Sequence, residues 1–130
     1  MKMNDKEAVL AVNQAFYDAF THQDLTGMNQ IWFQGTTSFC IHPGGKVLQG
    51  WEEIRDSWQQ IFRNTNSLEI DVEIISVEIT SEIAYVILLE SVLQTVRGRK
   101  SKGVSLATNI FRKMAHKWCL VHHHGSPVMR

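Results

Sequence analysis

The chain has 130 residues, of which 44% are hydrophobic, and its 13 lysines and arginines balance 13 aspartates and glutamates. A chain of this length buries roughly two-thirds of the surface that it exposes when unfolded, so we expect a single domain over residues 1–130 that folds without a disulfide or a metal. Zero net charge excludes a global field that would attract nucleic acid or an anionic membrane, and no run of about 18 apolar residues could span a bilayer.

Two helices are predicted before Gly35. In the first, apolar residues recur at helical spacing from Val9 to Phe20. A side-chain oxygen of Asn4 or Asp5 can cap its start, and we expect this helix to run to about residue 22. Asp24 can cap a second, shorter helix in the same way.

A short hairpin and a third helix follow. Residues 36–42 form an alternating, strand-like segment, and Pro43-Gly44-Gly45 is typical of a turn. Residues 47–49 could be a very short return strand. The third helix is predicted over Trp51–Asn64, because its apolar residues line one helical face. That face consists of Trp51, Ile54, Trp58, Ile61 and Phe62.

Everything after Leu68 is predicted to be strand. The alternation of apolar residues changes phase at Ile74-Ile75, which indicates a β-bulge and therefore a bent strand. Further strands are expected over residues 83–96, 104–114 and 118–124. Because the helices precede the strands, the predicted class is α+β: a cone-shaped cup of a curved, bulged antiparallel sheet packed on three helices from the N-terminal half.

The segment Ile83–Leu89 is apolar on both of its faces, although only one face can pack on the helices. Something should therefore cover the second face, and a twofold homodimer is the commonest solution. Only Cys40 and Cys119 are present, both in apolar runs, so we interpret them as free thiols. With no signal-peptide pattern at the start, we expect a cytoplasmic location.

This pattern resembles the nuclear transport factor 2-like superfamily, which includes ketosteroid isomerases and SnoaL-like polyketide cyclases. Three motifs carry the resemblance: Cys40–Gly45 (CIHPGG), Gly50–Arg55 (GWEEIR) and Trp118–Val128 (WCLVHHHGSPV). The last motif also resembles the closing strand of the calcium/calmodulin-dependent kinase association domain. The resemblance implies a pocket between the first helix, the third helix and the concave face of the sheet. It implies no single activity, because this fold hosts enzymes, binding modules and oligomerisation domains.

The resemblance also implies where catalytic groups would lie. In ketosteroid isomerases a carboxylate base sits at the first hairpin, a position that matches His42 here. The late-strand oxyanion donor matches Asn109, and the first-helix tyrosine matches Phe16 or Tyr17. Since the two aspartates are absent, steroid isomerisation by that mechanism is not expected.

We therefore take His42 and Asn109 as candidate catalytic residues. An imidazole titrates near neutrality and can move a proton, while a carboxamide can donate to an oxyanion. The alternatives are a structural histidine that bonds the hairpin backbone and a bonded core amide. Glu90 interrupts an apolar strand, so it could bond Arg112 or line the pocket.

Five further residues complete the candidate ligand-binding set. An aromatic wall is considered from Tyr17, Trp32 and Trp58, although the helical spacing of Trp58 and Trp51 is first of all that of a core stripe. His122 and His124 share one strand face, whereas His123 points away. They could supply two metal ligands, with His42 as a third, but no carboxylate partner stands at a fixed spacing. We expect no metal site there.

The function expected from these observations is a small-molecule pocket that uses no cofactor. It would bind a mostly apolar, carbonyl-containing molecule, and isomerase, cyclase or dehydratase chemistry by acid–base steps would fit. The alternatives are a non-catalytic ligand-binding module and an oligomerisation domain. No nucleic-acid or membrane partner is expected.

Overall fold

The computed structural model describes residues 3–129. Helix α1 (Asp5–Thr21) begins after Asn4, whose side chain accepts a hydrogen bond from the backbone N–H of Glu7 at 2.8 Å. Helix α2 (Leu25–Ile31) is capped by Asp24, as predicted. Helix α3 (Trp51–Asn64) has the predicted bounds, and it begins after Gly50, whose positive φ of 87° suits glycine. None of the helices in residues 3–129 has the length and apolar content that crossing a bilayer requires.

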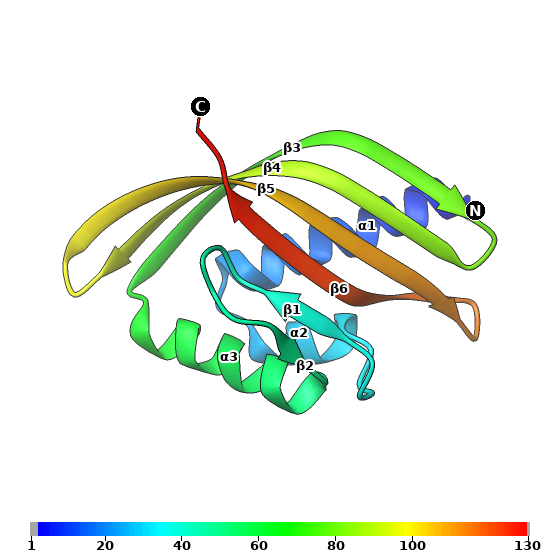
Figure 1. Cartoon of the computed structure of the whole chain (residues 1–130), viewed down its shortest axis with the longest axis horizontal. Helices are drawn as coiled ribbons and strands as arrows, with labels where there is room; N and C mark the ends of the chain where they lie inside the picture. Colours follow the sequence, from blue (N-terminus) through cyan, green and yellow to red (C-terminus); the bar gives the residue numbers. More distant parts are fainter. Residues whose placement is uncertain (1–2, 130) are drawn as a thin grey trace.

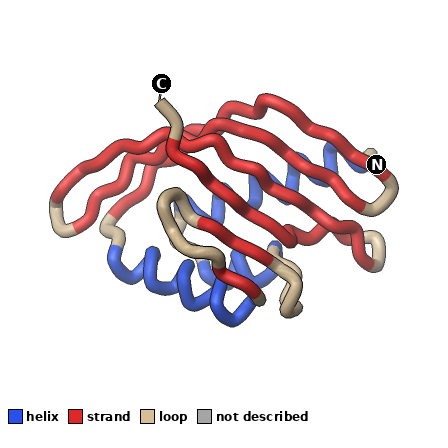
Figure 2. The backbone as a smooth tube through the Cα atoms, in the orientation of Figure 1, coloured by secondary structure: helices blue, strands red, loops and turns tan. Residues whose placement is uncertain are grey.

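Six strands form one curved sheet in the order β2-β1-β6-β5-β4-β3 (Figures 1 and 2). The four long strands pair antiparallel, and β1 joins β6 in parallel. The sheet does not close on itself, because β2 and β3 are its two edges. The strands are β1 (Phe39–Ile41), β2 (Leu48–Gln49), β3 (Ser67–Thr80), β4 (Ile83–Val96), β5 (Arg99–Met114) and β6 (Lys117–Pro127).

Several strand boundaries differ from the prediction, and the last strand, predicted over residues 118–124, runs from Lys117 to Pro127. The connection between the strands predicted over residues 83–96 and 104–114 is only a two-residue turn, Arg97-Gly98, and β5 begins at Arg99. Both turn residues have positive φ, 52° and 76°, which is the geometry that matches the twist of a hairpin. The strand predicted over residues 36–42 is reduced to Phe39–Ile41, because only these residues find partners on β2 and β6.

Two bulges bend the sheet. The pairing of β3 with β4 shifts between Ile74 and Ser76, so Ile75 is the extra residue and the predicted bulge is confirmed. A second bulge, not predicted, lies in β6. There Ile110 of β5 pairs with His122 and Phe111 pairs with Leu120, which leaves Val121 as the extra residue.

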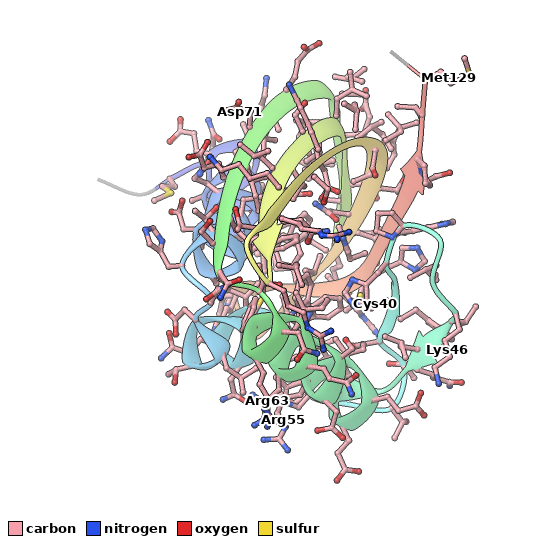
Figure 3. All side chains as sticks on the ribbon, turned by 90° about the vertical axis from the view of Figure 1, so that its left-hand side faces the viewer. Cys40, Lys46, Arg55, Arg63, Asp71 and Met129 are labelled. Atoms are coloured by element: carbon pink, nitrogen blue, oxygen red, sulfur yellow. The ribbon has the colours of Figure 1, made fainter. Side chains whose placement is uncertain are left out.

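The helices lie on one face of the sheet and the core lies between (Figure 1). Phe16 of α1 is at its centre, with the ring of Tyr17 at 4.9 Å, that of Trp58 at 5.6 Å and that of Trp32 at 6.2 Å between centroids. Cys40 lies inside the molecule, whereas charged side chains such as Arg55 and Arg63 project from α3 (Figure 3). The predicted α+β class, with three helices packed on a curved sheet, is confirmed.

The opposite face of the sheet has no layer over it in residues 3–129. Tyr85, Ile83 and Leu106 on this face are between 37% and 43% exposed. We call this surface the outer face. It carries the odd-numbered residues at the start of β4 and the even-numbered residues of β5 that pair with them, Ile83 with Arg112, Tyr85 with Ile110, Ile87 with Thr108 and Leu89 with Leu106.

Candidate ligand-binding cavity

A cavity of about 330 Å³ lies under the curl of the sheet, between the two longer helices. We call it the inner cavity. Its apolar wall comes from Phe20 of α1, Ile61 of α3 and Val92 of β4. Its polar side chains are His42, Glu90, Gln94, Ser101, Lys102, Ser105 and His123. The volume is at the small end of the range for ligand pockets, so it suits a small organic molecule.

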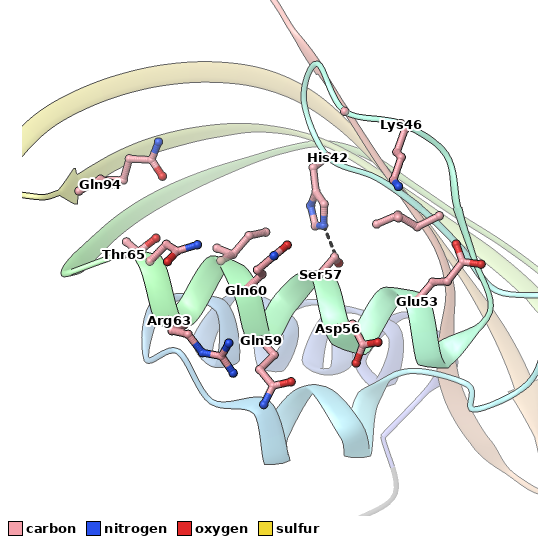
Figure 4. Close-up of a pocket in the computed structure, with 15 residues that line it drawn as sticks. His42, Lys46, Glu53, Asp56, Ser57, Gln59, Gln60, Arg63, Thr65 and Gln94 are labelled. Carbon is pink, nitrogen blue, oxygen red and sulfur yellow. Dashed lines mark hydrogen bonds between the residues drawn. The ribbon is translucent and has the colours of Figure 1, made fainter.

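A wider groove of about 810 Å³ runs along α3 and shares three residues with the inner cavity (Figure 4). The shared residues are His42, Ile61 and Gln94. The rest of its lining is mostly polar or charged, with Glu53, Arg63 and Lys46 among the residues. His42 therefore stands where an open polar groove meets a smaller and more apolar space.

His42 is fixed at the end of the first hairpin by its neighbours. Its carbonyl accepts a hydrogen bond from Gly45 N–H at 2.7 Å, which closes the predicted turn. Its Nε2 lies 3.0 Å from Ser57 Oγ (Figure 4), and the Ser57 hydroxyl donates to the carbonyl of Ile54 at 2.7 Å. Because the serine hydrogen is used there, Nε2 must carry the proton that it shares with Ser57. The lone pair of His42 is therefore on Nδ1.

Burial sets the charge of His42. It lowers the pKa of the imidazole from 6.5 to about 4, so the ring is neutral near pH 7. Trp58 meets His42 edge to face, with ring centroids 4.8 Å apart. A neutral imidazole with one unprotonated nitrogen is in the form that accepts a proton, and Cys40 Sγ lies 4.0 Å from that Nδ1.

Glu90 lies on β4 at the inner end of the cavity and is 2% exposed. Its Oε2 accepts a hydrogen bond of 2.7 Å from the Tyr17 hydroxyl. Burial raises the pKa of this carboxyl, and the bond from Tyr17 opposes that rise. The Arg112 partner considered from the sequence is paired elsewhere on β5, opposite Ile83 at the far end of β4.

Asn109 does not line the inner cavity but lies behind its wall, fully buried. Its Nδ2 donates to Asn13 Oδ1 at 2.9 Å and to the Tyr17 hydroxyl at 3.2 Å. This orientation of the amide is required, because the Tyr17 hydrogen is already used on Glu90. Asn109 Oδ1 is then the acceptor for His123 Nδ1. Both amide hydrogens of Asn109 are thus engaged within the protein.

His123 is the member of the histidine run that faces the cavity. Trp118 and Leu120 point inward, and simple alternation would turn His122 and His124 inward as well. The bulge at Val121 changes the phase by one residue, so His123 is buried instead. His122 and His124 lie together on the outer face, with ring centroids 6.3 Å apart. Burial lowers the pKa of His123 to about 3.

The two tryptophans named from the sequence lie in the core beside the cavity. Trp58 is fully buried between Phe16 and His42, and Trp32 stacks on Trp51 with centroids 6.3 Å apart. Neither is part of the cavity lining. The structure thus brings His42 and Glu90 into one cavity and connects Tyr17 and Asn109 to it through hydrogen bonds.

Four residues of this site are not among the candidate site residues predicted from the sequence. They are Asn13, Ser57, Ser105 and His123. A signal existed for Asn13, a polar residue on the apolar side of a helix that also contains Val9 and Phe16. No group of three metal-binding side chains is arranged to hold an ion within residues 3–129.

Comparison with known proteins gives a family. A family model described as a SnoaL-like domain matches residues 9–130. The F-box protein SKIP8 of Arabidopsis thaliana is 28% identical over 122 residues, which make up 94% of this chain and 50% of that protein. The chain therefore spans about half the length of this relative.

Solved structures with the same fold are also found. A protein of Streptomyces avermitilis, provisionally called a dehydratase of the NTF2-like family, is 30% identical, with a TM-score of 0.89 and 97% of each chain covered. A protein of Thiobacillus denitrificans, provisionally called a calcium/calmodulin-dependent protein kinase type II association domain, is 27% identical. It has a TM-score of 0.82 and covers 92% of this chain and 94% of its own. The predicted NTF2-like resemblance is confirmed.

Proposed function

This chain belongs to the SnoaL-like domain family, and we propose that its inner cavity binds a small, mostly apolar molecule that carries a carbonyl group. We further propose that His42 moves a proton of that molecule without a cofactor. The observation that carries the proposal is the composition of the cavity: a neutral imidazole and a buried carboxyl face a space walled by Phe20, Ile61 and Val92.

The chemistry is acid–base transfer at carbon. His42 Nδ1 takes a proton from the carbon beside the carbonyl, and the electron pair of that C–H bond moves onto the carbonyl oxygen. The Ser105 hydroxyl and the Gln94 amide, both in the lining, are the donors that can meet the developing negative charge. Return of the proton to another carbon completes an isomerisation, and its transfer to a departing hydroxyl completes a dehydration. The second outcome agrees with the description of the Streptomyces avermitilis relative as a dehydratase.

Asn109 has a positioning role in this proposal rather than direct contact with the ligand. Its two N–H groups are engaged by Asn13 and Tyr17, so they are not free for an oxyanion. Through its carbonyl oxygen it holds His123 in one tautomer, and through Tyr17 it orients Glu90. The Asn109 amide therefore fixes the orientation of the polar residues His123 and Glu90 without lining the cavity itself.

Hydrogen–deuterium exchange tests the proton transfer without a known substrate. Small apolar ketones are incubated with the protein in deuterium oxide, and exchange at the carbon beside the carbonyl is followed by NMR. His42→Gln should abolish catalysed exchange, because glutamine retains a donor for Ser57 but no basic nitrogen. His116→Asn is the matched control, since His116 is exposed in the β5–β6 turn at a positive φ that asparagine tolerates. Exchange that persists in His42→Gln contradicts the assignment.

A homodimer through the outer face is a second proposal, and it is supported by a different observation. Ile83, Tyr85 and Leu106 are exposed large apolar side chains on the outer face of the adjacent strands β4 and β5. A relative with this fold is described as an association domain. Light scattering at micromolar concentration should give twice the chain mass, and Tyr85→Glu should give the single mass. A monomeric unmodified chain would rule this proposal out.

A further inference from the structure

The inner end of the cavity holds a carboxylate that lacks a cation. Glu90 is 2% exposed, and the one hydrogen bond that it receives within residues 3–129 comes from Tyr17 to Oε2. The nearest basic group is His123, whose Nε2 lies 3.9 Å from Oε2. Buried charges in proteins are normally paired, because removal of an ion from water is costly. Glu90 is therefore a buried carboxyl group that faces an open space, and burial raises its pKa while no cation is beside it. Lys102 lines the same cavity, but no ion pair within residues 3–129 joins it to Glu90.

His123 does not supply that counter-charge while its ring is neutral. The proton on its Nδ1 is donated to Asn109, whose own two hydrogens go to Asn13 and Tyr17. In the neutral ring, Nε2 carries a lone pair that points toward the Glu90 carboxyl group. Burial also lowers the pKa of His123 to about 3, so the ring stays neutral near pH 7. Two acceptors consequently face each other across a gap too wide for a direct hydrogen bond.

The backbone of β6 places no side chain beside the other oxygen of Glu90. A Cβ atom at Gly125 of β6 would lie 3.6 Å from Glu90 Oε1 and 3.0 Å from Pro43. Glycine at this position leaves the space beside the carboxylate open. The apolar wall of Phe20, Ile61 and Val92 lies on the same cavity. A ligand that fits this space has a donating, positively charged end and a short apolar body.

Building on the proposed function of this cavity, we infer that its ligand is a small organic primary amine, with the ammonium group seated between the Glu90 carboxylate and His123 Nε2. An ammonium group has three donors and no acceptor, so two of its hydrogens can be donated to the two neighbouring acceptors, which lie 3.9 Å apart. Its charge neutralises the one buried carboxylate of the cavity. The carbon chain then extends toward His42, so the amine end orients the molecule and the other end is available for proton transfer.

The test compares three probes of similar shape that differ in the polar group: phenethylamine, phenethyl alcohol and phenylacetate. Binding to the unmodified chain is measured by NMR titration near neutral pH. A hydrogen bond to a charged group is worth roughly 1.5–3 kcal/mol, so the amine should bind about tenfold or more tightly than the alcohol. Phenylacetate should bind least, because its charge repels Glu90. Equal or tighter binding of the alcohol or the carboxylate overturns the inference, and so does the absence of amine binding at about 10 mM.

Substitution of Glu90 gives a second measurement. Glu90→Gln should remove the preference for the amine and leave the weak binding of the alcohol, which also reports that the variant is folded. Glu82→Gln is the matched control, because Glu82 is exposed in the β3–β4 turn. An amine preference retained in Glu90→Gln overturns the inference, and an unfolded variant leaves the three-probe comparison on the unmodified chain decisive.

The outcomes separate this inference from the proposed function. If no ketone exchanges deuterium but the amine is preferred, the proton-transfer proposal fails and the ligand class stands. If exchange depends on His42 but the alcohol binds as well as the amine, the proton-transfer proposal stands and the inferred ligand class fails.

Discussion

On the face that packs on the helices, strands β4, β5 and β6 bury a few polar side chains beside the apolar core, whereas β4 and β5 expose apolar side chains on the outer face, which a sheet with one covered side usually keeps polar. Glu90, Asn109 and His123 are buried on the inner face, whereas Tyr85 and Leu106 are exposed on the other. Glu90, Asn109 and His123 are joined through Tyr17 in one hydrogen-bonded network. The difference indicates that the inner face is built around a site, while the outer face is built for contact with another surface.

The largest effect is expected from a break in the inner network. Asn109→Ala would leave Asn13 Oδ1 and His123 Nδ1 without their partner and would remove one of the two hydrogen bonds of the Tyr17 hydroxyl, and every unpaired buried polar group costs about 1–3 kcal/mol. We expect a loss of about 4 kcal/mol in the free energy of unfolding, measured by urea denaturation. Asn66→Ala, at an exposed loop position, is the control and should change little. A loss below about 1 kcal/mol would show that the network is not a stabilising unit.

Acid should destabilise the folded chain through the two buried histidines. The folded pKa is about 4 for His42 and about 3 for His123, against an ordinary value of 6.5. At pH values between the folded and the ordinary pKa, the unfolded chain binds more protons than the folded chain. The stability that the neutral histidines contribute is therefore complete above pH 6.5, and the free energy of unfolding falls as the pH decreases. Burial raises the pKa of Glu90, and this contribution has the opposite sign and partly offsets the loss.

For these reasons the free energy of unfolding should fall by about 3 kcal/mol from pH 7 to pH 5. Urea denaturation at a series of pH values measures this slope. In His42→Gln the slope should be roughly half as steep, because one of the two histidines no longer titrates. A stability that is flat over this interval, or a slope that His42→Gln leaves unchanged, would contradict the neutral state of the buried rings.

Features of the sheet could be predicted from the sequence where the alternation of polar and apolar residues shows which face of the sheet a side chain lies on. The bulge at Ile75 could be predicted because apolar residues change phase there between charged neighbours. Glu90 was noticeable as a charge within an apolar strand. The bulge at Val121 gave no such signal, because it lies between apolar Leu120 and three identical histidines. A run of like residues has no period, so the sequence could not indicate which histidine faces the cavity.

The hydrogen-bond partners of the site residues could not be predicted from the sequence, for a related reason. The bonds that fix Asn109 connect residues 14, 92 and 96 positions away. They depend on how α1 crosses the sheet, and local patterns do not contain that information. The sequence could therefore predict the fold and the polar residues of the inner cavity. It could not predict which of these residues line the cavity and which only position the lining residues.

The smallest change in stability is expected on the outer face. Leu106 on β5 and Leu88 on the paired strand β4 are chemically identical, but Leu88 is fully buried against the helices and Leu106 is 37% exposed. Leu88→Ala should cost about 3 kcal/mol, since it removes buried contacts and leaves a cavity in the core. Leu106→Ala should cost less than about 1 kcal/mol within a single chain, because solvent already reaches the side chain.

Self-association should show the opposite order for the same two substitutions. Leu106→Ala should raise the dissociation constant of the proposed dimer by about tenfold, since an apolar side chain of the interface is lost. Leu88→Ala should leave that constant nearly unchanged, because the side chain faces away from the outer face. Dilution series followed by light scattering measure both constants. If Leu106→Ala is neutral in both measurements, the outer face is not the contact surface, and its apolar character must serve a partner other than a second copy of this chain.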